Sequence, residues 1–216
     1  MVISDNNTTA LGIMGGTFDP VHYGHLRAAL EVTELFKLDQ LKLIPCARPS
    51  HRNQPQTPDY MRADMLALAI KHYANLSLDT RELHRPGKSY TVDTLVSLRE
   101  ELPEHPLLLF IGTDAFNQLT SWYQWQRLFD YAHIIVLARP NTELPTLNAF
   151  CQQRLAQQRD ELSQHLAGLL YLQTITQLDI SATAIRQLIA QGKNPGFLLP
   201  DAVIEYIHQH RLYQSL

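Results

Sequence analysis

A chain of 216 residues is long enough to bury one sizeable hydrophobic core and short for two. Its formal net charge is −3 and no stretch is densely basic, so it lacks the electrostatic footprint of a nucleic-acid-binding protein. No apolar run approaches the ~18 residues of a membrane span, and no charged and then apolar segment opens the chain, so we expect neither a membrane protein nor a secreted one.

Short apolar runs alternate along the chain with segments of helical periodicity. This alternation is typical of βαβ units and of a parallel sheet with both faces covered. We therefore predict an α/β protein with a Rossmann-like, doubly wound parallel sheet, one domain over 1–216, C-terminal helices and a flexible polar start at 1–9. The predicted strands lie near 11–14, 41–45, 76–78, 107–111, 134–138 and 169–172.

The segment that follows the first predicted strand carries the most chemical information. It reads Gly-Gly-Thr-Phe-Asp-Pro-Val-His-Tyr-Gly-His and joins the strand, through a glycine turn at Gly15 and Gly16, to a helix expected over 22–36. Glycines lack a Cβ, so their backbone N–H groups can approach an anion closely. His22 and His25 lie three apart on the first helical turn, at the positive end of the helix dipole. This arrangement suits phosphoryl or nucleotidyl transfer, in which the protein mainly positions the reactants and neutralises charge.

A polar loop and further helices follow in chain order. Residues 46–56 are rich in Pro, Asn, Gln and Arg, which favours a mobile loop over a ligand site. Four more helices are expected. One starts at Thr57 as N-cap with Pro58 in first position, and another follows Ser89. A solvated outer helix should cover 148–165, and an amphipathic helix should run from Pro200 to Tyr213. Ligands of open parallel sheets lie beyond the carboxyl ends of the strands, so the segments after the strands should meet in one crevice.

The heptapeptide Ile-Ser-Ala-Thr-Ala-Ile-Arg at 180–186 is the second candidate for chemistry. Ser181 is predicted to cap a helix over 182–191, and Thr183 and Arg186, three apart, share a face at its start. Free N–H groups at a helix start and the planar fork of an arginine suit a pyrophosphate. Taken alone, the same pattern also fits an ordinary capped surface helix with an exposed arginine.

The first segment resembles the His-x-Gly-His signature of the nucleotidyltransferase superfamily, and the heptapeptide resembles its second motif, Ile-Ser-Ser-Thr-x-Ile-Arg, with Ala182 in place of a serine. Smaller signals between them extend the resemblance to bacterial nicotinate-nucleotide adenylyltransferases over nearly the whole chain. These signals are Pro-Ser-His-Arg at 49–52, Ser-Tyr-Thr at 89–91, Gly-Thr-Asp at 112–114 and Trp-Tyr at 122–123.

The resemblance implies transfer of the adenylyl group of ATP to nicotinate mononucleotide, which gives nicotinate adenine dinucleotide and pyrophosphate in NAD biosynthesis. It implies catalytic roles for His22, His25 and Arg186, with His25 nearest the α-phosphate. Phosphate-binding roles fall to Gly15, Gly16, Thr17, Phe18, Ser181 and Thr183. Nicotinate mononucleotide would be bound by His51, Arg52, Thr91, Gly112, Asp114, Trp122, Tyr123 and Arg139.

Magnesium is expected to arrive with ATP, because no cluster of carboxylates with metal spacing is visible, and Asp19 is the residual candidate to touch it. The expected partners are small-molecule substrates only, with neither nucleic acid nor membrane, in a monomer or small homo-oligomer. Cys46 and Cys151 lack metal-ligand and redox spacing, which favours free thiols in a reducing cytoplasm.

Three alternatives stay open at this point. A pantetheine-phosphate adenylyltransferase or a cytidylyltransferase would share the phosphate machinery, but those families resemble shorter chains without the Ser-Tyr-Thr and Trp-Tyr signals. A class I aminoacyl-tRNA synthetase would need more length and a basic surface. A non-catalytic dinucleotide-binding protein or a dehydrogenase would want Gly-x-Gly-x-x-Gly and an acidic residue ~20 positions later, which Gly-Gly-Thr-Phe does not match.

Overall fold

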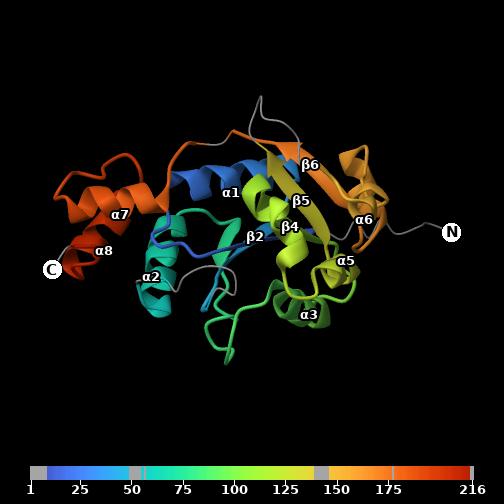
Figure 1. Cartoon of the computed structure of the whole chain (residues 1–216), viewed down its shortest axis with the longest axis horizontal. Helices are drawn as coiled ribbons and strands as arrows, with labels where there is room; N and C mark the ends of the chain where they lie inside the picture. Colours follow the sequence, from blue (N-terminus) through green and yellow to red (C-terminus); the bar gives the residue numbers. More distant parts are fainter. Residues whose placement is uncertain (1–8, 49–54, 56, 139–145, 177, 215–216) are drawn as a thin grey trace.

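Six parallel strands form one sheet in the order β3-β2-β1-β4-β5-β6 (Figure 1). The computed structural model describes residues 9–48, 55, 57–138, 146–176 and 178–214. The strands are β1 Leu11–Gly16, β2 Gln40–Pro45, β3 Leu76–Leu78, β4 Leu107–Gly112, β5 His133–Ala138 and β6 Leu170–Thr174. All six predicted strands are thus confirmed, as is the doubly wound α/β sheet.

The helices alternate with the strands along the chain. The α-helices are α1 Tyr23–Leu35, α2 Asp59–Ile70, α3 Thr91–Glu101, α4 Thr113–Asn117, α5 Leu128–Tyr131, α6 Ala149–Gln152, α7 Ala182–Ala190 and α8 Asp201–Gln209. Short 3₁₀ helices cover Leu119–Ser121, Trp125–Arg127 and Arg159–Gln164. None of the helices in the described ranges has the length and apolar character that crossing a bilayer requires.

Two apolar cores cover the two faces of the sheet, because successive side chains of a strand point to opposite faces. In β4, Leu108 and Phe110 belong to the core that contains the buried faces of α1, α2, α7 and α8. Leu107, Leu109 and Ile111 belong to the other core, which contains the buried residues of α3, α4 and α5. The strand is therefore apolar throughout, as a parallel strand buried on both faces must be.

The chain leaves β1 and β4 toward opposite faces of the sheet. After β1 it enters α1 in the first core, whereas after the neighbouring strand β4 it enters α4 in the second. The carboxyl ends of these two strands therefore flank a crevice at the topological switch point, which is where doubly wound sheets bind ligands.

Three local predictions within the chain were wrong, and so was the end of the last predicted helix: the helix expected from Pro200 to Tyr213 ends at Gln209 as α8, and Arg211 and Tyr213 have positive φ. Gly15 and Gly16 do not form a turn of their own: both pair in register with β2, and the carbonyl of Gly16 accepts a hydrogen bond from the N–H of Cys46, so β1 extends through them. The N-cap of α2 is Pro58 rather than Thr57, because the first helical hydrogen bond runs from the N–H of Arg62 to the carbonyl of Pro58.

The third correction concerns 148–165, which is not one helix. Helix α6 ends at Gln152, and the backbone then turns to pair with the sheet: Leu155 and Leu170 form a parallel bridge, and the N–H of Ala156 donates to the carbonyl of Leu170. This pairing satisfies backbone groups beside β6 that a continuous outer helix would leave without partners.

Candidate active site

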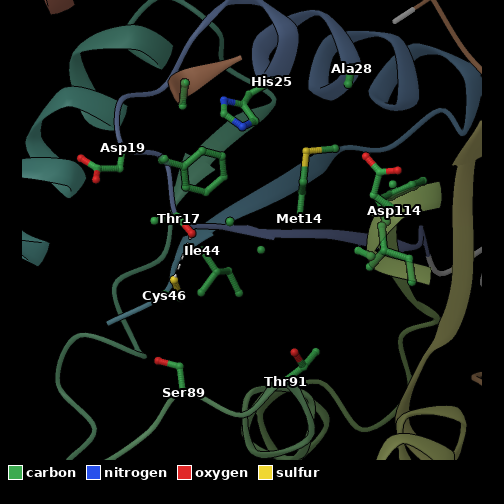
Figure 2. Close-up of a pocket in the computed structure, with 18 of the residues that line it drawn as sticks. Met14, Thr17, Asp19, His25, Ala28, Ile44, Cys46, Ser89, Thr91 and Asp114 are labelled. Atoms are coloured by element: carbon green, nitrogen blue, oxygen red, sulfur yellow. Dashed lines mark hydrogen bonds between the residues drawn. The ribbon is translucent and has the colours of Figure 1, made fainter. Parts of the chain in front are cut away.

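A cleft of about 830 Å³ lies at the carboxyl ends of β1 and β4. Figure 2 shows His25 and Ala28 of α1 along one rim, Ser89 and Thr91 along the opposite rim, and Asp114 at the far side from Asp19. The cleft brings together most of the residues that the sequence singled out. Those that line it are Gly15, Gly16, Thr17, Phe18, Asp19, His22, His25, Thr91, Gly112, Asp114, Trp122, Tyr123, Thr183 and Arg186.

Ser181 is the one predicted site residue within the described ranges that does not line the cleft. Ser181 is the N-cap residue of α7, as expected, but its exposed side chain makes no capping hydrogen bond and it is not part of the cleft lining. His51, Arg52 and Arg139, with most of the predicted mobile loop 46–56, lie outside the described residues.

His22 and His25 form a stacked pair above the end of β1. Their ring centroids are 3.7 Å apart at an interplanar angle of 27°. The rings of Phe18 and His25 form an edge-to-face pair with their centroids 5.1 Å apart. Each histidine has a buried Nδ1 atom for which the described residues supply no hydrogen-bond partner. Nδ1 of His22 is turned toward the backbone of Gly24, so a ligand in the cleft would meet other parts of the two rings, both of which line it.

Both imidazoles are uncharged near neutral pH. Burial lowers the pKa of His22 to about 4, and burial together with the neighbouring His22 lowers the pKa of His25 to about 3. A neutral imidazole offers one N–H donor and one acceptor, so each ring of the pair can donate a hydrogen bond to an anionic oxygen while it stays uncharged.

Steric crowding explains why a glycine, Gly24, lies between the two histidines. A Cβ on Gly24 would lie 2.9 Å from Nδ1 of His22, closer than real Cβ contacts allow. Gly16 is similar, because a Cβ there would lie 2.9 Å from the ring of Phe18. The two glycines therefore let the rings of His22 and Phe18 lie against the backbone beneath the histidine pair.

Replacing Gly24 by alanine should impair catalysis more than folding. Alanine favours a helix by about 0.5–1 kcal/mol over glycine, which offsets part of the clash, whereas the displaced His22 ring loses its stacking on His25. We expect Tm to stay within about 4 °C of wild type and kcat/KM to fall at least about tenfold. Thermal melts and steady-state assays check this, and wild-type kinetics in Gly24→Ala would contradict the steric role of the glycine.

Arg186 and Thr183 connect the second motif to the first. Nη1 of Arg186 donates to the carbonyl oxygen of Asp19 at 2.7 Å, across 167 residues of sequence, and Nη2 donates to Oγ1 of Thr183 at 3.2 Å. The start of α7 thus lies beside the turn that follows β1. Free helix N–H groups, a hydroxyl and a guanidinium gather there, and this set of donors suits phosphate oxygens.

The opposite part of the cleft is aromatic. Trp122 packs on the second core, and the half-exposed Tyr123 ring meets the Tyr90 ring at 4.6 Å between centroids. A Cβ on Gly112 would meet no atom within 4 Å, so the backbone at the end of β4 is open to the cleft. An aromatic wall facing an open backbone can hold a flat ring that carries an anionic substituent.

Arg62 is the main residue that sequence reasoning missed. It is only 1% exposed, and its guanidinium donates to the carbonyls of Thr17 at 2.6 Å, Cys46 at 2.7 Å, Thr57 at 3.2 Å and Ala47 at 3.4 Å. It therefore ties the turn after β1 to the segment after β2. An arginine within the apolar face of a predicted helix was the available signal.

Ser89 and Glu82 complete the lining on the side of α3. The Ser89 hydroxyl accepts from the N–H of Ala47, and Oγ1 of Thr94 donates to Glu82 at 2.7 Å. Burial raises the pKa of Glu82, and the hydrogen bond from Thr94 acts against that rise.

The described residues contain no group of three or more His, Cys, Asp or Glu side chains that could hold a metal ion. Asp19 lines the cleft and is 5% exposed, but its Oδ1 already accepts a hydrogen bond from the hydroxyl of Tyr213 at 2.6 Å.

Comparisons with known proteins agree with this geometry. A family model described as cytidylyltransferase-like matches residues 13–188. The chain is 45% identical to a protein of Methylococcus capsulatus, and the match covers 94% of this chain and 99% of that protein. It is 42% identical to a protein of Marinomonas sp., with 99% of this chain and 100% of that protein covered. Both relatives carry the name "Probable nicotinate-nucleotide adenylyltransferase".

Solved structures support the same fold. Two structures of a Plasmodium falciparum nicotinic acid mononucleotide adenylyltransferase, complexed with APC and with NaAD, superpose with a TM-score of 0.72 at 19% and 18% identity, over 95% of this chain and 97% of theirs. The matched family model and the high identity to full-length relatives lead to one conclusion. This chain belongs to the cytidylyltransferase-like family and, within it, to the nicotinate-nucleotide adenylyltransferases.

Proposed function

We propose that this protein transfers the adenylyl group of ATP to nicotinate mononucleotide, giving nicotinate adenine dinucleotide and pyrophosphate, as a step of NAD biosynthesis. The observation that carries the proposal is the stacked, uncharged histidine pair, which lines the same cleft as Arg186 and Thr183. Relatives at 42–46% identity bear the name of this activity.

The reaction needs no general base. The second pKa of a phosphomonoester is near ~6, so an oxygen of the mononucleotide phosphate is already ionised at neutral pH. That oxygen attacks the α-phosphorus of ATP, the new P–O bond forms as the bond between the α-phosphorus and the bridging oxygen breaks, and pyrophosphate leaves with the electron pair. No proton has to move, which agrees with histidines that are neutral and act as hydrogen-bond donors.

Each part of the cleft then has a role in the proposal. His25, with His22 beside it, donates to the oxygens of the α-phosphate as charge accumulates there. Backbone groups of Gly15–Phe18 and the start of α7 surround the phosphates, and Arg186 with Thr183 receives the pyrophosphate. Ser181 remains a predicted phosphate contact at the start of α7. The nicotinate mononucleotide is held by Thr91, Gly112, Asp114, Trp122 and Tyr123, with His51, Arg52 and Arg139 as further predicted contacts.

Magnesium bound to the triphosphate would supply charge neutralisation and orientation. We place the reaction in the cytoplasm, where Cys46 and Cys151, both unbridged in the structure, would stay reduced.

A direct assay tests the function. Purified protein, ATP and MgCl₂ are incubated with nicotinate mononucleotide, nicotinamide mononucleotide, phosphopantetheine or CTP with a phosphosugar alcohol, and pyrophosphate and dinucleotide are measured. We expect dinucleotide from the nicotinate substrate with kcat/KM at least about tenfold above the nicotinamide substrate. The proposal assigns backbone N–H donors at the open end of β4 to the nicotinate carboxylate, and an amide would present donors of its own to this donor-lined pocket and leave them unpaired. Equal efficiency would refute the donor-lined pocket, and turnover only with phosphopantetheine or CTP would refute the function.

Arg186→Lys should weaken ATP use although the charge is kept. Arg186 spans the Asp19 carbonyl and the Thr183 hydroxyl with two separate nitrogens, which a single ammonium cannot do while also contacting phosphate. We expect KM for ATP to rise about tenfold with little change in KM for the mononucleotide. Steady-state kinetics with each substrate varied in turn provides the measurement, and an unchanged KM for ATP would remove Arg186 from the pyrophosphate site.

A further inference from the structure

The last residues that the structure describes return to the phosphate end of the cleft. Tyr213 follows α8, and its hydroxyl donates to Oδ1 of Asp19 at 2.6 Å, across 194 residues of sequence. Asp19 is 5% exposed and lines the cleft in the turn after β1. The carbonyl of this same residue accepts the 2.7 Å hydrogen bond from Arg186. Asp19 is thus held from two sides, by the C-terminal segment and by the second motif.

Several observations show that the Tyr213 contact is held firmly. Tyr213 has a left-handed backbone, with φ of 61°, which non-glycine residues adopt rarely and keep where the surroundings impose it. Its side chain and that of Leu212 pack against the first core. In Figure 1, α7 and α8 lie at the side of the molecule where α2 lies.

The hydroxyl of Tyr213 acts as a donor at every working pH. Burial raises the pKa of this phenol well above its usual range, and the neighbouring Asp19 carboxylate adds to the rise. A hydrogen bond from a hydroxyl to a carboxyl group in a buried place is among the stronger kinds in proteins. It keeps one oxygen of Asp19 occupied, so the side chain of this residue is held in place in the turn after β1.

We propose that Tyr213 is a positioning residue for ATP: through Asp19 it holds the turn after β1 and the guanidinium of Arg186 in the arrangement that receives the triphosphate. The proposal rests on the proposed function, because it assigns the phosphate end of the cleft to ATP. It makes the C-terminal segment part of the nucleotide site, although no residue of that segment needs to touch the nucleotide.

Tyr213→Phe removes the hydroxyl and keeps the ring that packs on the core. We expect KM for ATP, and Kd for ATP by calorimetry, to rise about fivefold to tenfold, because ATP binding must then order the turn that the hydroxyl holds in the free protein. This fold-change corresponds to about 1–1.4 kcal/mol. KM for nicotinate mononucleotide should stay within about twofold, because its part of the cleft is on the other side, and Tm within about 4 °C.

Tyr206→Phe is the matched control. Tyr206 on α8 makes the same kind of bond, from its hydroxyl to Oδ2 of Asp64 at 2.8 Å, but the carboxylate lies exposed on α2 and outside the cleft lining. This variant should keep wild-type affinity for ATP. Equal losses in the Tyr206 and Tyr213 variants would mean a general effect of the C-terminal segment on stability and would overturn the proposal.

A double-mutant cycle tests the route through Asp19. In an Asp19→Ala background, or in Asp19→Asn where the alanine variant does not fold, adding Tyr213→Phe should raise Kd for ATP by less than about twofold, because the partner of the hydroxyl is already gone or altered. An undiminished effect there, or wild-type ATP affinity in Tyr213→Phe alone, would refute the proposal. Failure of the proposed function would look different, since the wild-type protein itself would form no dinucleotide.

Discussion

His25→Ala should lower kcat about 10²–10³-fold while the protein stays folded. Removing one preorganised donor from a site where charge accumulates in the transition state has an effect of this size, roughly 3–4 kcal/mol. His25 is partly exposed at the cleft and touches mainly the rings of His22 and Phe18, so its truncation should change the free energy of unfolding by only about 1 kcal/mol. Single-turnover rates and thermal melts of both proteins measure the two effects separately.

His72→Ala is a suitable control, because His72 is exposed in the turn after α2 and away from the cleft lining. It should keep wild-type turnover. If His25→Ala retained more than about a third of the wild-type rate, or if its loss followed unfolding alone, His25 would be a structural residue and the central assignment would be wrong.

The pH dependence follows from the lowered pKa values. The folded protein holds His22 and His25 neutral with pKa values of about 4 and 3, whereas an unfolded histidine titrates near 6.5. Below pH 6.5 the unfolded state binds more protons, so the free energy of unfolding should fall as pH drops from about 6.5 toward 4, and these groups contribute no pH dependence above 7. The fall should be smaller in His25→Ala, and raising the pH should not rescue its turnover, because no histidine acts as a base.

The sequence predicted the sheet well because its signal is local. Apolar runs bounded by turn residues mark strands that are buried on both faces, and β4 and β5 are apolar along nearly their whole length. The spacing of His22 and His25 likewise predicted a shared face. That the rings stack, lose their charge and rest on Phe18 depends on packing around them, which spacing alone does not report.

The errors arose where backbone groups found distant partners. The 148–165 segment has the sparse apolar spacing of a solvated helix, yet Leu155 and Ala156 pair with Leu170 at the edge of the sheet. Thr57 has the side chain of a good N-cap, but it is buried, its carbonyl accepts from Arg62, and α2 starts after it. A cap preference is worth about 1 kcal/mol, which such tertiary contacts outweigh.

In the candidate site, too, local features could be predicted from the sequence and long-range contacts could not. The two motifs could be recognised from residue types and spacing, whereas the contacts that join them could not. Arg186 reaches the backbone of Asp19, and Tyr213 reaches its side chain, across 167 and 194 residues. A backbone carbonyl is present at every position of the chain, so the sequence does not indicate which carbonyl accepts a hydrogen bond from a distant arginine.

Arg62→Met should be the most destabilising of the changes considered. Methionine fills a similar apolar path, but it leaves the carbonyls of Thr17, Cys46 and Thr57 without their donor in a buried place. Hydrogen bonds to charged groups contribute about 1.5–3 kcal/mol each and are not additive, so we expect a loss of about 3 kcal/mol or more in the free energy of unfolding. For a chain of this size that corresponds to a fall in Tm of about 6–12 °C.

Arg62→Lys and Arg27→Met are the comparison variants for the loss of stability in Arg62→Met. Lysine keeps the charge but offers one nitrogen, which cannot reach carbonyls on three sides, so an intermediate loss is expected. Arg27 makes a surface ion pair with Glu31 at 3.3 Å with a 39% exposed side chain, and its removal should change stability by less than about 0.5 kcal/mol. Chemical denaturation of the three variants gives the comparison. A wild-type midpoint in Arg62→Met would show that the turn after β1 and the segment after β2 hold together without the guanidinium, and the neighbouring Asp19–Arg186 and Asp19–Tyr213 bonds would then have to position the phosphate turn unaided.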